Sequence, residues 1–177
     1  MHRRGFTIIE LVTVIALIII LAYLAIMSYG RAKANSKLSR VSADLEEISQ
    51  SVSEYVQDNN YQYPPDVDRG VPPGLEKYLQ GGTWPTSVWP HGVFDWDNIL
   101  VNGDGPQAIQ ITYRLCDTVA NPNEPLSDCA DPLLFPHFTQ YSSIFYCIFG
   151  PCVPHQYHPT DPGFCVNCKV KPQNPPL

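Results

Sequence analysis

The first third of this chain lacks both proline and cysteine. All 18 prolines lie at or after Pro64, and the first of the six cysteines is Cys116. A single charge, that of Glu10, lies between Phe6 and Tyr29. Because proline interrupts helices, a proline-free segment can form one continuous helix, whereas the proline-rich remainder is expected to be rich in loops. These absences divide the chain into a helical first third and a loop-rich head.

The chain is also poor in basic residues, which number 11 against 17 acidic ones and leave a net charge of −6. Residues 1–58 hold equal numbers of both signs, so the net negative charge lies in residues 59–177. A nucleic-acid-binding face must be basic to neutralise phosphates, and we expect no nucleic-acid partner for the head. The sequence has no glycine-rich phosphate loop and no Gly-x-Ser-x-Gly motif, and we expect that the protein is not an enzyme.

The N-terminal region contains a long apolar run. The 24 residues Phe6–Tyr29 would span about 36 Å as a helix, which is enough to cross a bilayer core of about 30 Å. Arg3 and Arg4 precede the run, and basic residues on one side favour a cytoplasmic N-terminus. The run therefore predicts a single membrane-spanning helix with the head outside.

Three interpretations compete for this region. The first is a cleaved secretory signal peptide with a cleavage site at Ala32-Lys33-Ala34, but the apolar run is too long for such a peptide. The second is a plain signal anchor, which leaves Glu10 unexplained. The third rests on Gly5-Phe6-Thr7-Ile8-Ile9-Glu10-Leu11, which resembles the class III signal of the type IV pilin and type II secretion pseudopilin superfamily.

The resemblance implies a specific maturation. In that family a prepilin peptidase cuts on the cytoplasmic side after the glycine and N-methylates the new terminal phenylalanine, which here are Gly5 and Phe6. The new amine would lie four residues before Glu10, and in a helical polymer it can pair with Glu10 of a neighbour. A carboxylate at the edge of a bilayer is costly unless it is neutralised, and a buried ion pair can set the register of neighbouring helices.

The resemblance also implies partners and a location. The expected partners are other copies of this chain and other pilins, the prepilin peptidase, the pilus or secretion assembly machinery of the inner membrane, and the lipid bilayer before assembly. The chain would reside in the cytoplasmic membrane and then in a cell-surface filament. A type IV pilin fits best, a type II secretion or DNA-uptake pseudopilin is the alternative, and a membrane-anchored binding protein that never polymerises is the rival from another class.

Beyond the apolar run, hydrophobic residues continue at alternating steps of four and three, which is typical of an amphipathic helix packed on a head. The stripe comprises Ala34, Leu38, Val41, Leu45, Ile48, Val52 and Tyr55. A helix from Phe6 to Asp58 would be about 80 Å long. The expected divisions are a cleaved leader (1–5), a membrane and assembly half (6–29), an amphipathic half (30–58) and a disulfide-rich head (59–177).

The head contains few clear elements. Residues 108–115 alternate between apolar and polar side chains, which predicts a strand, and residues 142–149 predict a second strand. Residues 73–79 predict a short helix before Gly81 and Gly82. Together these patterns predict an α+β fold in which a long N-terminal helix packs on a small antiparallel sheet.

The six cysteines follow a membrane segment, which favours disulfides over free thiols. They are Cys116, Cys129, Cys147, Cys152, Cys165 and Cys168. Cys116–Cys129 is the best single pair because it closes a compact loop after the strong strand, and the other four can pair locally or nest. The alternative is a zinc site that combines the last four cysteines with His155 and His158.

An Asp-rich stretch suggests a second metal site. Asp95, Asp97 and Asp104 lie in a segment dense in oxygen donors, which can bind calcium, and the major pseudopilins are similar in having a calcium-binding loop. The spacing is not that of an EF-hand, and such runs are mostly ordinary turns. Three tryptophans surround this stretch and are expected in the head core or at subunit contacts: Trp84, Trp89 and Trp96.

Overall fold

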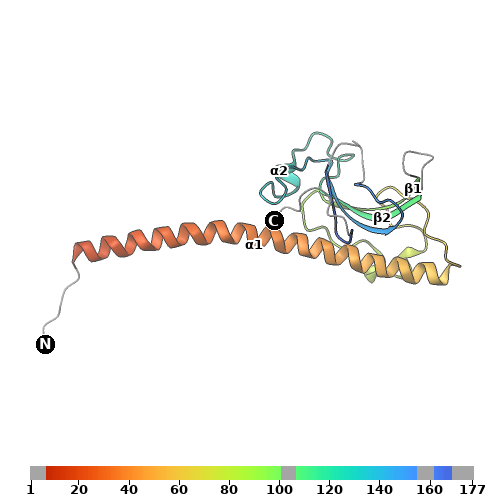
Figure 1. Ribbon diagram of the computed structural model, residues 1–177, viewed down its shortest axis with the longest axis horizontal. Coiled ribbons are helices and arrows are strands. Elements are labelled where there is room, and N and C mark those ends of the chain that lie inside the picture. Colours follow the sequence, from red (N-terminus) through yellow and green to blue (C-terminus); the bar gives the residue numbers. More distant parts are fainter. Residues whose placement is uncertain (1–6, 101–106, 155–161, 169–177) are drawn as a thin grey trace, which may run out of the picture.

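The computed structural model describes residues 7–100, 107–154 and 162–168 and shows one long helix, α1 (Ile8–Asp58), with a four-stranded sheet packed on its C-terminal half (Figure 1). The α+β class is therefore confirmed. The other elements follow in the order η1 (Leu75–Lys77), η2 (Gln80–Gly82), β1 (Val93–Leu100), β2 (Gln107–Arg114), α2 (Leu126–Cys129), β3 (Ser143–Phe149) and β4 (Gly163–Cys165).

Helix α1 is continuous over 51 residues and is not interrupted at Gly30. Its length is about 77 Å at 1.5 Å per residue. The helix ends where Asn59 donates its backbone N–H to the carbonyl of Tyr55 at 3.0 Å. Asn60 and Tyr61 then adopt left-handed backbone angles, with φ of 54° and 60°, which turn the chain back toward the head.

The apolar stripe of α1 packs against the sheet, as its spacing predicts. Val41, Leu45 and Val52 have no exposed surface, and Ile109 and Ile111 of β2 are equally buried in the same core. The head covers one side of the helix and begins at Ala34, the first buried residue of the stripe. The second half of α1 thus forms one wall of the hydrophobic core of the head.

The sheet has the strand order β1-β2-β3-β4, and its first two pairings are antiparallel. The last pairing, β3 with β4, is parallel and places Ser143 opposite Gly163. The sheet is therefore mixed, and the expectation of a purely antiparallel sheet is corrected at this edge. A parallel pair needs a connection of about a dozen residues or more, which the 13 residues 150–162 provide.

Strand β1 occupies the stretch that its Asp and Asn residues suggest to be a loop. Phe94 and Trp96 enter the core beside α1, with Trp96 opposite Ile111, while Asp95 and Asp97 lie on the other face of the sheet. Asp and Asn are depleted in strands, which explains why composition hides this element. The predicted core role of the tryptophans is confirmed, with Trp96 fully buried.

We expect Leu45→Ala to lower the free energy of unfolding by about 2–5 kcal/mol, because it leaves a cavity between α1 and the sheet. The matched control is Leu24→Ala, since Leu24 is 57 % exposed on the same helix. Unfolding of the full chain in detergent can be followed by tryptophan fluorescence, because all three tryptophans lie in the head. Equal losses in the two variants would contradict this packing.

The partly buried carboxyl of Asp44 should make the stability of the fold depend on pH. Burial raises the pKa of its carboxyl above the ordinary value of 3.8, Arg40 opposes the shift and Glu47 adds to it. A pKa raised in the folded state means that the ionised carboxylate lowers the free energy of unfolding. This loss is absent below pH 3.8, where the carboxyl is protonated in both states, and it grows as the pH rises through the folded-state pKa. Asp44→Asn should therefore raise the melting temperature at pH 7 and leave it unchanged near pH 3, and a uniform shift at both pH values would contradict this cause.

Candidate functional site

The first half of α1 is exposed and is not covered by the described residues of the head. From Ile8 to Ile26 its side chains are exposed, and the segment is long and apolar enough to cross a membrane. Figure 1 shows this half projecting from the head as a bare rod. A monomer in water would leave an apolar surface of this size uncovered, which is typical of membrane or protein contact sites.

Glu10 forms the first turn of this rod together with Thr7. The Thr7 backbone N–H and hydroxyl both donate to Oε2 of Glu10, at 2.9 and 2.8 Å, and the Glu10 N–H donates to the Thr7 hydroxyl at 3.3 Å. This reciprocal arrangement is a capping box, which satisfies N–H groups that the helix itself leaves open. The sequence signal was Thr7-x-x-Glu10 before an apolar run, and sequence reasoning missed it. Gly5 and Phe6 lie outside the described residues.

Asp95 lies in the head as one member of a buried ion pair. Its Oδ2 accepts from Arg114 Nε at 2.9 Å and also from Nη2, while its Oδ1 accepts from the backbone N–H of Arg69 at 2.8 Å. Asp95 is 1 % exposed and Arg114 is 8 % exposed. The two residues come from the neighbouring strands β1 and β2, so the pair ties the sheet to the loop that carries Arg69.

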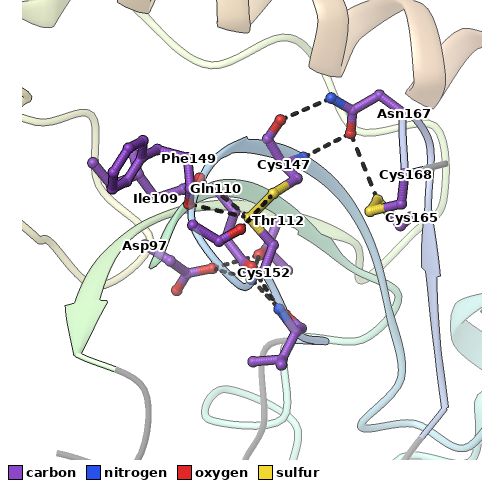
Figure 2. Close-up of a disulfide and its surroundings, with 12 residues drawn as sticks. Asp97, Ile109, Gln110, Thr112, Cys147, Phe149, Cys152, Cys165, Asn167 and Cys168 are labelled. Carbon is purple, nitrogen blue, oxygen red and sulfur yellow. Dashed lines mark hydrogen bonds between the residues drawn. A yellow bond between two sulfur atoms is a disulfide. The ribbon is translucent and has the colours of Figure 1, made fainter. Parts of the chain in front are cut away.

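Asp97 belongs to a second buried polar group on the same face (Figure 2). Its Oδ2 accepts from the hydroxyl of Thr112 and from Gln110 Nε2 at 3.2 Å. Gln110 also exchanges two hydrogen bonds with the backbone of Val153, at 2.7 and 3.1 Å. These contacts fasten the loop after β3 across the face of the sheet that points away from α1.

The predicted calcium ligands therefore have protein partners where the structure describes them. Asp95 pairs with Arg114, Asp97 accepts from Thr112 and Gln110, and Asp104 lies outside the described residues. In residues 7–100, 107–154 and 162–168, no group of three or more His, Cys, Asp or Glu side chains could hold a metal ion. The described geometry adds nothing to the calcium hypothesis, which stays a prediction that melting curves with and without calcium can test.

A pocket of about 240 Å³ lies beside this polar face. It is smaller than the pockets of about 300–1,000 Å³ that commonly hold small-molecule ligands. Charged side chains dominate its lining, which includes Asp66, Asp68, Arg69, Asp95, Asp97 and Arg114. Several of these charges already form ion pairs with each other. We therefore interpret the pocket as the solvent-exposed side of these ion pairs.

All six cysteines form disulfides between sequence neighbours. The predicted Cys116–Cys129 pair is confirmed, and the other four pair locally as Cys147–Cys152 and Cys165–Cys168. The zinc alternative is wrong for these cysteines, because a disulfide sulfur has no thiolate to offer a metal. His155 and His158, its other proposed ligands, lie outside the described residues.

Asn167 joins the last two disulfide loops, as Figure 2 shows. Its side-chain amide accepts from the backbone N–H of Cys147 at 2.8 Å and donates to the Cys147 carbonyl at 2.7 Å. These bonds continue the parallel pairing of β3 and β4 beyond Cys165 by one side chain. The short strand β4 is thus held at its end by a residue inside the Cys165–Cys168 loop.

Comparison of the chain with known protein families, curated proteins and solved structures finds no match in any of the three. The functional argument therefore rests on the exposed apolar half of α1, its single carboxylate and the placement of the head.

We expect Asp95→Asn to destabilise the head by about 3–5 kcal/mol, because it removes the closer counter-charge of the buried Arg114 guanidinium and leaves the exposed Asp68 at 3.8 Å. The control is Arg40→Gln, which removes a long contact of 3.9 Å with Asp44: the Arg40 side chain is 61 % exposed and that of Asp44 is 14 % exposed. That pair should contribute less than about 1 kcal/mol. Urea unfolding of the full chain in detergent measures the change in the free energy of unfolding for both variants. A small change for Asp95→Asn would mean that water takes the place of the lost carboxylate beside Arg114.

Proposed function

We propose that this chain is a subunit of a type IV pilus-like filament, stored in the cytoplasmic membrane and assembled through its N-terminal helix. The observation that carries the proposal is the bare first half of α1, whose side chains are exposed from Ile8 to Ile26. Such a surface needs lipid before assembly and other copies of itself afterwards. One apolar rod can meet both needs, because lipid and neighbouring helices are alike in polarity.

The one-sided attachment of the head supports the same proposal. The sheet covers one side of the second half of α1 and leaves the other side open (Figure 1). A bundle of such rods can therefore bring their helices together while the heads remain on the outside. The disulfides suit a head of this kind, because they stabilise small domains exposed to oxidising surroundings.

The lone carboxylate of Glu10 gives the proposed polymer a specific contact. Processing after Gly5 would create an amine on Phe6, the residue directly before the cap residue Thr7. That amine on one subunit would pair with Glu10 of its neighbour among apolar helices. The capping box complicates a test at this position, because a change that removes the side-chain oxygen acceptor of Glu10 would also alter the start of α1.

We expect Glu10→Gln to reduce assembled filaments by at least about tenfold while membrane insertion stays normal. Glutamine also serves in a capping box, so the variant removes the charge of a buried ion pair and keeps the helix start. The control Thr7→Val removes the capping hydroxyl and keeps the charge, and it should assemble nearly as well as the original chain. Filament yield in sheared cell-surface material is the measurement.

The same experiment separates the proposal from its rival. If both variants lose filaments equally, the role of Glu10 is to start the helix. If neither changes anything, and the original chain stays in the membrane fraction, the chain is an anchored head that does not polymerise. The intact mass of sheared material gives a second check, since a processed subunit begins at N-methylated Phe6 and is about 6 Da lighter than its reduced form for three disulfides.

A further inference from the structure

Four charged side chains form a straight row on the second half of α1. Lys33, Arg40, Glu47 and Glu54 are spaced by seven residues, and all four are exposed. Seven residues are nearly two turns, so the row drifts by only about 20° per step around the helix. It lies beside the buried stripe and not within it, because the stripe residues occupy other positions of the same repeat.

The signs of these charges change once along the helix. Within residues 31–58 every basic residue precedes Asp44, and every acidic residue is Asp44 or follows it. The basic residues are Arg31, Lys33, Lys37 and Arg40, and the acidic residues are Asp44, Glu46, Glu47, Glu54 and Asp58. The row is therefore basic at the end near the apolar rod and acidic at the far end.

The head uses these four side chains very little. Among the residues that the structure describes, Arg40 makes one ion pair, a long 3.9 Å contact with Asp44, and its side chain is largely exposed. In the described parts of the chain, no salt bridge engages Lys33, Glu47 or Glu54. Because water screens the exposed Arg40 guanidinium, its long contact with Asp44 contributes little to stability, so the row is not explained by the fold of one subunit.

We propose that this row binds a second copy of the chain, lying parallel and displaced by 14 residues, so that Lys33 faces Glu47 and Arg40 faces Glu54 of the neighbouring copy. At 1.5 Å per residue the displacement is about 21 Å. The inference rests on the proposed filament and adds the contact that fixes one axial offset within it.

Charge complementarity selects this displacement over the simpler ones. With no displacement each charge faces its own kind, because Lys33 faces Lys33 and Glu47 faces Glu47. With a displacement of seven residues, Lys33 faces Arg40 and Glu47 faces Glu54, so two like-charged contacts accompany one favourable one. Only the 14-residue shift pairs both basic residues with acidic ones and leaves no like-charged contact within the row. An antiparallel pair is excluded because both apolar rods must enter one bilayer in the same direction.

The surface beside the row can accept a helix at close range. It carries small, exposed side chains at helical spacing: Ala32, Ser36, Ser39 and Ala43. Small side chains allow two helix backbones to approach closely. An anionic membrane surface is a poorer occupant, because Glu47 and Glu54 would be repelled by it. A second copy of α1 offers acidic residues to the basic end of the row and basic residues to its acidic end.

This contact differs from the one proposed for Glu10. The Phe6 amine lies four residues from Glu10, which corresponds to about 6 Å along a helix, whereas the charged row requires about 21 Å. The two contacts therefore involve different neighbours. A head-to-tail interface that does not close generates a helical filament, and each subunit of such a filament touches neighbours at more than one axial offset.

Charge reversal tests the row directly. Reversing only the basic pair, K33E with R40E, should reduce sheared filaments by about tenfold or more, because two attractions at each contact become repulsions. Reversing only the acidic pair, E47K with E54K, should do the same. The variant with all four reversals restores complementarity at the same displacement and should recover filaments to within about threefold of the original chain. If the fourfold variant does not recover filaments while the original chain forms them, the proposed pairing of the row between two copies is wrong. The filament proposal itself would remain intact.

Cross-linking measures the displacement itself. Ser36, Ala43 and Gln50 are exposed on the same side of α1 at steps of seven residues. The double variant S36C with Q50C should give a ladder of multimers with a short bismaleimide reagent on intact filaments, because the two cysteines of neighbouring copies meet at a 14-residue shift. The double variant S36C with A43C should give no ladder, and S36C alone should give no dimer. A ladder from the seven-residue pair would overturn the inference, and an original chain that makes no filaments would overturn the proposed function and the inference together.

Discussion

The head exists because one face of the second half of α1 is apolar. Val41, Leu45 and Val52 lie in full contact with the inner face of the sheet, and burial of such side chains contributes about 1.5–3 kcal/mol each. The same contact fixes how far the helix projects, because Ala34 is the first described residue of α1 that is buried. The length of the bare rod is therefore set by where the stripe begins.

The outer face of the sheet is held together by different means. The ion pair of Asp95 with Arg114 and the hydrogen bonds of Asp97 and Gln110 replace apolar packing there. The Cys147–Cys152 disulfide closes the loop directly before Val153, which Gln110 contacts, and Asn167 of the Cys165–Cys168 loop bonds to the backbone of Cys147. Buried charges are costly unless paired, so this face depends on a complete set of partners, whereas the α1 face depends on volume and shape.

The sequence predicts those parts of the structure whose pattern repeats. The period of the α1 stripe and the alternation in β2 gave correct elements, because each is long enough to establish its period, and the second predicted strand, residues 142–149, corresponds to β3. Strand β1 was missed since Asp95 and Asp97 resemble turn residues, and the Arg114 that neutralises one of them is distant in sequence. Strand β4 has three residues, too few for any period, and only the fold reveals that Asn167 extends it.

The capping box stabilises the carboxylate of Glu10 at the start of an apolar helix. An isolated carboxylate there is costly, yet Oε2 of Glu10 already accepts two hydrogen bonds from Thr7 within its own chain. The chain therefore carries a local partner for the one charge of its apolar half before any neighbouring copy would bind. In the proposed filament, the amine of a neighbouring copy would add a counter-charge to a carboxylate that Thr7 already holds in place. The side chain of Glu10 would therefore be ordered before the neighbouring copy binds.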